Sequence, residues 1–229
     1  MAVNKVETID DWVRVTTVLA SVSDKTGLEA LARGLLRVNP SLTILSTGGT
    51  FTALEHALGA AAASRLQQVS RYTGQPEMQG GLVKTLDFRI YLGLLSETYN
   101  PAHSADLART SARPIDLVVA NLYPFERASS APGATLEDAR ANVDIGGPCM
   151  VRAAAKNFHR VAALTDPEDY PAVLEELAAH QGALCLATRY RLAQKAFGLT
   201  ARYDAAIAGY FQATPLAAQR AIYSVRSGG

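Results

Sequence analysis

The sequence predicts an α/β domain built on a parallel β-sheet, and three observations support this fold class. Runs rich in apolar, β-branched residues alternate with segments of helical periodicity, glycine-containing polar loops follow several of these runs, and 48% of the 229 residues are hydrophobic against 19% charged. Such alternation of strands and helices is typical of a parallel sheet covered by helices. The length suits one large domain, with or without an appendage.

The first strand is expected over residues 15–22 (VTTVLASV), followed by the polar loop SDKTG and a helix over residues 28–38 (LEALARGLLRV). The same order then repeats, with a short strand over residues 42–45, the loop STGGT and a helix over FTALEHAL. Two successive strand–helix units favour parallel pairing of their strands.

Three further strands are expected over residues 66–69, 115–122 and 161–164, and helices over residues 136–141, 148–156 and 168–179. Between them, residues 70–113 show little clean periodicity and contain the polar string YTGQPEMQGGLVKTL. Because long irregular segments in compact domains are often functional, we expect a functional loop here.

Residues 184–211 have a helical pattern in which Leu186, Tyr190, Ala193, Phe197 and Ala201 follow one face. We therefore expect an α/β domain over residues 1–183 and a helical appendage over residues 184–229, packed on that domain or on a second subunit. The final residues, 223–229, are expected to be frayed.

The charge balance excludes several classes of function. Lys and Arg total 22 against 21 Asp and Glu, so the sequence has no electrostatic footprint for nucleic acid or for an anionic membrane. It has neither a secretory signal nor a run of eighteen apolar residues. The two cysteines, Cys149 and Cys185, lie far apart and form no CxxC motif, which predicts neither a disulfide framework nor a zinc site and favours a cytoplasmic location. The histidines also lack the spacing of metal ligands, so we expect no metal site; they are His56, His103, His159 and His180.

Polar clusters fall at or just beyond the expected carboxyl ends of strands. Open α/β sheets bind their ligands at that edge, so we expect these clusters to meet in one site. They are residues 21–27 (SVSDKTG), 46–50 (STGGT), 80–86 (GGLVKTL), 121–125 (NLYPF) and 143–157 (VDIGGPCMVRAAAKN).

The STGGT loop is a candidate phosphate site. Its glycines can bring backbone N–H groups to an anion at a helix N-terminus, with hydroxyls from Ser46, Thr47 and Thr50 beside them. Lys25 could add a positive charge. The alternatives are an ordinary strand–helix turn and a solvated lysine, and the loop is not a Walker motif because no GK[ST] follows.

The DIGGP segment can be read in two ways. Asp144 and the glycines after it are consistent with a helix-entry cap and tight turn that Pro148 continues. Alternatively, Asp144 joins Lys84, Lys156 and a phenol as a proton-transfer set. Lys156 also suits a helix C-terminus electrostatically. The sequence contains no GxSxG elbow, which argues against a serine hydrolase.

Taken in order, these motifs resemble the IMP cyclohydrolase domain of the bifunctional purine-biosynthesis protein that also carries AICAR formyltransferase. The resemblance runs from about Val18 to Phe211, through SVSDKTG, STGGT, YTGQPEM, GGLVKTL, PIDLVVANLYPF, DIGGPCMVRAAAKN, LATRYRLAQKAF and TARYDAAIAGYF. It implies a methylglyoxal-synthase-like fold with helices flanking a parallel sheet, a homodimer, no cofactor, and a chain without the formyltransferase domain.

The resemblance also implies a reaction, the closure of 5-formamidoimidazole-4-carboxamide ribotide to inosine monophosphate with loss of water. By resemblance Lys84, Tyr123, Asp144 and Lys156 match the catalytic positions. Asp144 would accept a carboxamide proton, while Lys156 and Tyr123 stabilise or protonate the formyl oxygen and Lys84 could share that task.

The same resemblance assigns the substrate-binding residues. Those around the 5′-phosphate are Ser21, Lys25, Ser46, Thr47, Gly48, Gly49, Thr50 and Thr85, and those near the base are Asn121, Gly146 and Gly147.

The chain departs from the family pattern in one loop, reading GLVKTLDFRIYLG in place of GRVKTLHPKIHGG, and KNF in place of KNH. The changed positions are Leu82, Asp87, Phe88, Tyr91, Leu92 and Phe158. A lost arginine removes a charge-assisted contact of about 1.5 to 3 kcal/mol, so we expect Lys25 to compensate or Arg89 to move in.

Two rival interpretations remain: an enzyme acting on a related ribotide, which the altered loop supports, and a non-catalytic sensor of phosphoribotides. The presence of the acid, the phenol and both lysines disfavours the sensor. NLYPF and AAAKN disfavour methylglyoxal synthase itself.

Overall fold

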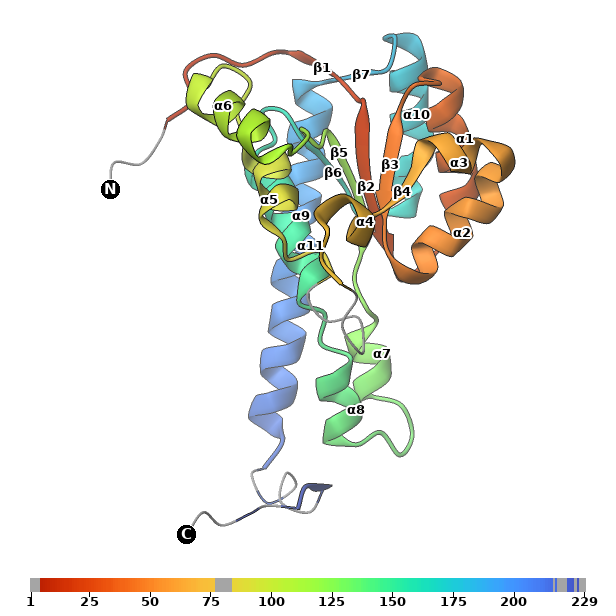
Figure 1. Cartoon of the computed structure of the whole chain (residues 1–229). Coiled ribbons are helices and arrows are strands. Elements are labelled where there is room, and N and C mark those ends of the chain that lie inside the picture. Colours follow the sequence, from red (N-terminus) through yellow and green to blue (C-terminus); the bar gives the residue numbers. More distant parts are fainter. Residues whose placement is uncertain (1–4, 77–83, 216, 218–221, 225, 227–229) are drawn as a thin grey trace.

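The computed structural model describes residues 5–76, 84–215, 217, 222–224 and 226. Its centre is a five-stranded sheet with the strand order β4-β3-β2-β5-β6, in which every neighbouring pair is parallel (Figure 1). The strands are β2 (Thr17–Val22), β3 (Thr43–Ser46), β4 (Leu66–Gln68), β5 (Leu117–Asn121) and β6 (Ala162–Leu164). The predicted parallel α/β sheet is therefore confirmed.

The strand order creates a switch point between β2 and β5. After β2 the chain builds outward through β3 and β4 on one side, and it then returns to place β5 and β6 on the other. Asn121 pairs with Val22 and Ser46 pairs with Ala20, so β2 and β5 end together and β3 ends two residues earlier at the same edge of the sheet. Ligands of open α/β sheets bind at such a point.

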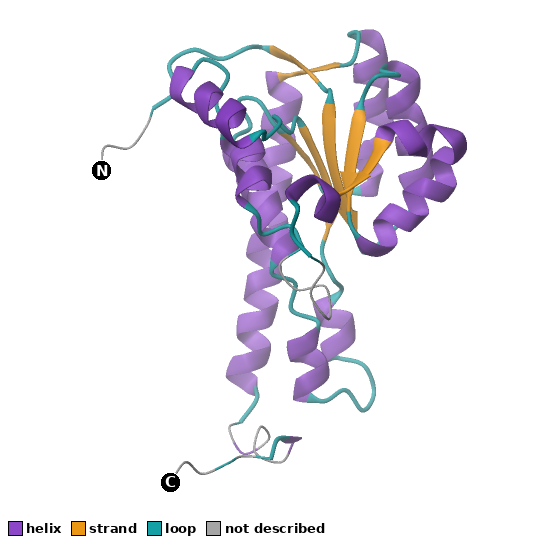
Figure 2. Ribbon diagram, in the orientation of Figure 1, coloured by secondary structure: helices purple, strands orange, loops and turns teal. Residues whose placement is uncertain are grey.

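Helices cover both faces of the sheet (Figures 1 and 2). One face packs against α1 (Leu28–Val38), α2 (Gly48–Leu58) and α10 (Tyr170–Ala179), and the other packs against α5 (Phe88–Leu95), α9 (Gly146–Lys156) and α11 (Leu186–Ala213). Along β2, Val18 and Ala20 belong to the first core cluster and Leu19 to the second. Burial on both faces explains why the strands are continuously apolar rather than alternating.

The remaining elements are short. Strands β1 (Trp12–Arg14) and β7 (Ala183–Cys185) form a separate antiparallel pair, which the sequence did not reveal because three residues carry no periodicity. The others are α3 (Ala62–Arg65), α4 (Val69–Thr73), α6 (Pro101–Thr110), α7 (Phe125–Ser129), α8 (Leu136–Ala141) and the 3-10 turns Gly59–Ala61 and Pro167–Asp169.

The expectation of a long irregular loop over residues 70–113 is wrong for a large part of the segment, because the end of α4, α5 and α6 lie within it. The sequence feature that indicates α5 and α6 is the N-cap residue of each. The Asp87 carboxylate accepts the Arg89 N–H at 2.8 Å, and the Asn100 side chain, just before Pro101, accepts two N–H groups of α6. Helix α5 is apolar on most sides, which hides its period. Residues 77–83 of the segment lie outside the described residues.

The long C-terminal helix is confirmed as α11, but its predicted apolar face is wrong. Of the five residues assigned to that face only Ala193 is buried, whereas Tyr190 and Phe197 are exposed. The buried side comprises Arg189, Leu192, Ala193, Ala196 and Thr200. The error has a physical cause, since a fully buried arginine lies on the inner face.

The Arg189 guanidinium links helix α11 to several distant segments by hydrogen bonds. It donates hydrogen bonds to five backbone carbonyls, those of Asp10, Asp11, Phe158, His159 and Leu184. These carbonyls belong to the N-terminal segment, the loop between α9 and β6, and β7. A single side chain thereby ties α11 to three separate parts of the chain.

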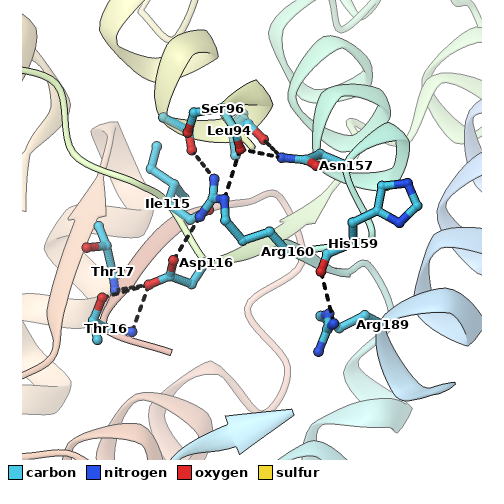
Figure 3. A network of polar contacts seen from close by, with 11 residues as sticks. Thr16, Thr17, Leu94, Ser96, Ile115, Asp116, Asn157, His159, Arg160 and Arg189 are labelled. Carbon is cyan, nitrogen blue, oxygen red and sulfur yellow. Dashed lines mark hydrogen bonds and ion pairs between the residues drawn. The ribbon is translucent and has the colours of Figure 1, made fainter. Parts of the chain in front are cut away.

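A second network closes the amino ends of β2, β5 and β6 (Figure 3). The buried ion pair between Arg160 and Asp116 measures 2.9 Å, and the second carboxylate oxygen of Asp116 accepts hydrogen bonds from Thr16 and Thr17. Arg160 also donates to the carbonyls of Ser96 and other residues of adjoining segments. The carboxyl ends of the strands are left for the site.

Candidate active site

A cavity of about 400 Å³ lies over the carboxyl ends of β2, β3 and β5. Its walls bring together most of the residues that the sequence assigned to a site. These are Ser21, Lys25, Thr47, Gly48, Gly49, Thr50, Lys84, Thr85, Asn121, Tyr123, Asp144, Gly146 and Gly147. Ser46 and Lys156 do not line it.

One end of the cavity is built for an anion. The Lys84 Nζ lies 3.3 Å from the position that a Cβ would take on Gly48, and the Lys25 Nζ lies 3.9 Å from the corresponding position on Gly49. Two ammonium groups therefore flank the first turn of α2, whose N–H groups lack helical partners. Gly48 has a φ of +47°, a conformation that other residues seldom adopt.

The hydroxyls near this end divide into two groups. Ser46 donates to the Ala20 carbonyl at 2.8 Å, and Thr50 both donates to and accepts from the backbone of Val22 at 3.0 Å. These side chains are buried and join β2 to β3 and α2. Thr50 also lines the cavity, whereas Ser46 does not, contrary to the expectation that Ser46 helps to build the phosphate pocket. The hydroxyls of Ser21 and Thr47, 3.4 Å apart, line the cavity itself.

Asn121 shapes the loop that carries Lys25. Its Oδ1 accepts the N–H groups of Ser23 at 2.7 Å and Asp24 at 2.8 Å, while its Nδ2 donates to the Asp24 carbonyl at 2.8 Å. Both acceptor sites of Oδ1 and one of the two Nδ2 protons are thus engaged at the end of β5. The second Nδ2 proton can be donated to a ligand in the cavity that Asn121 lines, so a contact near the base, as expected from the sequence, stays a prediction.

Asp144 also lines the cavity, from the turn that starts α9. Its Oδ1 accepts the Gly147 N–H at 2.8 Å, so the predicted helix-entry cap is present. Burial raises the pKa of the Asp144 carboxyl above its ordinary value, and hydrogen bonds from the backbone of Gly147 and Tyr123 partly offset this. A half-buried carboxyl with a raised pKa in a cavity is typical of a general base.

Beside Asp144, the Tyr123 side chain is 52% exposed, which leaves its phenol open to a ligand. Gly147 accepts no side chain here, because a Cβ would collide with the Asp144 carboxylate and with Leu122. Two apolar lining residues, Ile145 and Met150, were not singled out from the sequence. They supply a wall against which a planar base could pack.

Lys156 lies apart from this constellation. It is exposed at the last position of α9, and the 1.5 Å rise per residue puts it about 15 Å along the helix axis from Gly146. The expectation that one pocket of this chain gathers Lys156 with Asp144 is therefore wrong. Its position at the helix C-terminus fits the electrostatic alternative.

The altered loop is only partly described, because Leu82 lies in the undescribed range. Arg89 donates to the Tyr72 carbonyl at 2.9 Å and does not line the cavity, so it does not move in to replace the missing arginine. Lys25 and Lys84 are the cations placed there. The other departures also lie off the cavity wall; they are Asp87, Phe88, Tyr91, Leu92 and Phe158.

Within the described ranges, no group of three or more His, Cys, Asp or Glu side chains is placed to hold a metal ion. No described helix combines the length and the apolar character needed to cross a membrane.

The sheet order and the cavity define the class of protein. The chain belongs to the MGS-like domain family, whose model matches residues 27–149, and a model described as the AICARFT/IMPCHase bienzyme matches residues 154–227. Among curated relatives, the bifunctional purine biosynthesis protein PurH of Bradyrhizobium diazoefficiens is 50% identical over 86% of this chain and 36% of its own length. The protein of the same name from Synechococcus sp. is 48% identical, over 87% of this chain and 37% of its own length.

The chain thus spans little more than a third of the length of these relatives. Among solved structures, that of ForH superposes with a TM-score of 0.70 at 36% sequence identity. That match covers 86% of this chain and 99% of ForH. The methylglyoxal-synthase-like fold expected from the sequence is confirmed.

Proposed function

We propose that this chain is an IMP cyclohydrolase, which closes 5-formamidoimidazole-4-carboxamide ribotide to inosine monophosphate and releases water. One observation carries the proposal: a single cavity is lined both by two ammonium groups beside a helix N-terminus and by a carboxyl of raised pKa with a phenol. A ribotide has its phosphate and its reacting base at opposite ends. The match to the AICARFT/IMPCHase bienzyme model supports this activity, and the names of the PurH relatives support a role in purine biosynthesis.

In this proposal the phosphate binds at the start of α2, held by Lys25, Lys84 and the N–H groups of Gly48 and Gly49. Thr85, whose hydroxyl lies beside Gly146, adds a further donor to the cavity wall. The position of Lys84 beside Gly48 supports a binding role, in addition to the catalytic role that the family resemblance implies.

Ring closure needs little more than a fixed conformer and proton transfer, because both reacting groups belong to one molecule. The carboxamide nitrogen attacks the formyl carbon, Asp144 accepts a proton from that nitrogen, and Tyr123 donates to the formyl oxygen. Asp144 returns its proton to the resulting hydroxyl, which leaves as water, while the formamido nitrogen gives up its proton and Tyr123 is reprotonated. The new C–N bond to the carboxamide nitrogen and the second bond of the formamido C=N have then replaced the two bonds of the C=O group.

The direct test incubates the purified chain with the formamido ribotide and follows the purine absorbance, with and without EDTA. We expect turnover that EDTA leaves unchanged, since the proposed steps use only side chains of the chain. Tight ribotide binding without turnover would support the sensor instead. Turnover of a different ribotide in preference to this one would support the related-enzyme alternative.

We also propose that the protein works as a homodimer in the cytoplasm. Exposed aromatic rings along α11, among them Tyr190, Phe197 and Phe211, supply apolar surface for a second copy. Both cysteines are free, which suits a reducing compartment.

A further inference from the structure

The C-terminal helix α11 reaches the site through the hydroxyl of Tyr203. This oxygen accepts the backbone N–H of Asp144 at 2.8 Å and lies 3.3 Å from the Asn142 carbonyl, to which it donates. Both partners belong to the turn between α8 and α9 that carries the Asp144 carboxylate. One phenol therefore holds both ends of that turn.

The side chain is suited to this double role. Tyr203 is half-buried, and burial raises the pKa of its phenol, so the hydroxyl keeps its proton and can donate and accept at once. The ring also packs edge-on against Phe125, with centroids 6.3 Å apart, and Phe125 lies two residues after Tyr123. The same tyrosine thus contacts the segments of both proposed proton-transfer groups.

The two family matches divide the chain at this contact. Asp144 lies within the region matched by the MGS-like domain model, whereas Tyr203 lies within the region matched by the bienzyme model. The helix that extends beyond the MGS-like match is therefore connected to the cavity by a hydrogen bond.

We infer that Tyr203 is a positioning residue for the ring-closure reaction, which fixes the backbone of Asp144 so that its carboxylate meets the carboxamide nitrogen. This inference rests on the proposed function. Loss of the hydroxyl frees the turn at residues 142–144 while leaving the phosphate end of the cavity intact. A displacement of about 1 Å at a reacting group can lower the rate by about 10²-fold.

The chain provides a matched control in Tyr210, about two turns further along α11. Its ring also packs edge-on against Phe125, with centroids 5.8 Å apart, but within the described residues its hydroxyl makes no hydrogen bond. Tyr203→Phe and Tyr210→Phe each remove one hydroxyl and keep the ring. They differ in the bond to Asp144.

We expect Tyr203→Phe to lower kcat by about 10- to 100-fold with KM within about twofold of the parent value, and Tyr210→Phe to change neither. Affinity for inosine monophosphate, measured by titration calorimetry, should stay within about twofold for both variants, because the phosphate contacts remain. Equal effects of the two substitutions on kcat would refute the inference. An absence of turnover by the parent protein would instead refute the proposed function.

A double-substitution cycle separates positioning from general stability. If Tyr203 acts through Asp144, adding Tyr203→Phe to Asp144→Asn should lower kcat no further. A multiplicative loss in the double variant would mean that Tyr203 acts independently of Asp144 and would overturn the inference. The cycle is measured on protein whose folded fraction has been checked by circular dichroism.

Discussion

The charge state of Asp144 is set by opposing influences within a few residues. Burial favours the neutral carboxyl, while the N–H groups of Gly147 and Tyr123 favour the carboxylate, and burial prevails. A base of raised pKa holds a proton more strongly once it has accepted it. We therefore expect activity to rise with pH across the raised pKa of this group.

Asp144→Asn should lower kcat by about 10²- to 10⁴-fold with little change in KM, because the amide cannot accept the proton that leaves the attacking nitrogen. The Gly147 cap can persist, since the asparagine oxygen still accepts. Steady-state kinetics on the formamido ribotide check this. An unchanged kcat would show that the base lies elsewhere.

The same substitution should change how stability depends on pH. In the parent, the raised folded-state pKa of Asp144 means that a favourable contribution is fully present below the unfolded pKa, about 4, and is lost as pH rises through the folded pKa. Asn has no such loss. Urea unfolding should show the variant gaining free energy of unfolding relative to the parent over this interval, and a constant difference would contradict the assigned shift.

Lys25 should behave differently, since a phosphate contact is present in both the ground state and the transition state. We expect Lys25→Ala to raise KM and leave kcat nearly unchanged. Lys5→Ala, at an exposed position off the cavity wall, controls for the loss of one positive charge. A fall in kcat without a rise in KM would assign Lys25 to the chemistry.

At the scale of elements, the sequence predicted strands and helices correctly where their apolar residues form a clear pattern, as in α1 and β5. The predictions failed where contacts with distant segments determine which residues are buried. Helix α5 buries one face, formed by Ile90, Gly93 and Leu94, but its other residues are also mostly apolar, so its sequence shows no clear polar face. The inner face of α11 includes Arg189, whose charge indicated an outer position although five carbonyls surround it. No spacing in one sequence reveals carbonyls supplied by distant segments.

Substitutions of Arg189 and Arg191, a buried and an exposed arginine of the same helix, test how much the buried hydrogen-bond network contributes to stability. Arg189→Met should lower the free energy of unfolding by about 3 kcal/mol or more, because several carbonyls lose their donor in a buried place. Arg191, 47% exposed in its ion pair with Asp169, should cost less than about 1 kcal/mol when changed to Met. Urea unfolding measures both, and equal losses would mean that the buried network adds no particular stability.

At the scale of the whole molecule, the site was largely predictable because the carboxyl ends of parallel strands meet at one edge. Clusters separated by many residues, such as Ser21 and Gly146, therefore line one cavity. Partners that reach the site from outside that edge were not predictable. Tyr203 comes from a helix that crosses to the site, and its spacing in sequence from Asp144 carries no trace of this contact.

Lys156 could likewise reach a site from outside, in this case the cavity of a second copy of the chain. Since it lies outside the cavity of its own chain, any catalytic role must be exerted on a second copy. Light scattering should give twice 24.3 kDa if the proposed homodimer forms, and a mass of 24.3 kDa at working concentrations would exclude it. If the dimer forms, a complementation experiment can test whether Lys156 of one chain acts in the cavity of the other.

If Lys156 serves the partner's cavity, mixing two inactive variants should restore activity. A dimer of one Asp144→Asn chain and one Lys156→Ala chain has one cavity with both native groups, so random mixing should recover about a quarter of the parent rate. Mixing Asp144→Asn with Lys84→Ala is the control, because those residues line the same cavity and no intact site results. Recovery in the first mixture alone assigns Lys156 to the partner's site. Full activity of Lys156→Ala by itself would leave the lysine as a residue at a helix C-terminus, where its positive charge interacts favourably with the negative end of the helix dipole. An absence of recovery would exclude a role of Lys156 in the partner's cavity.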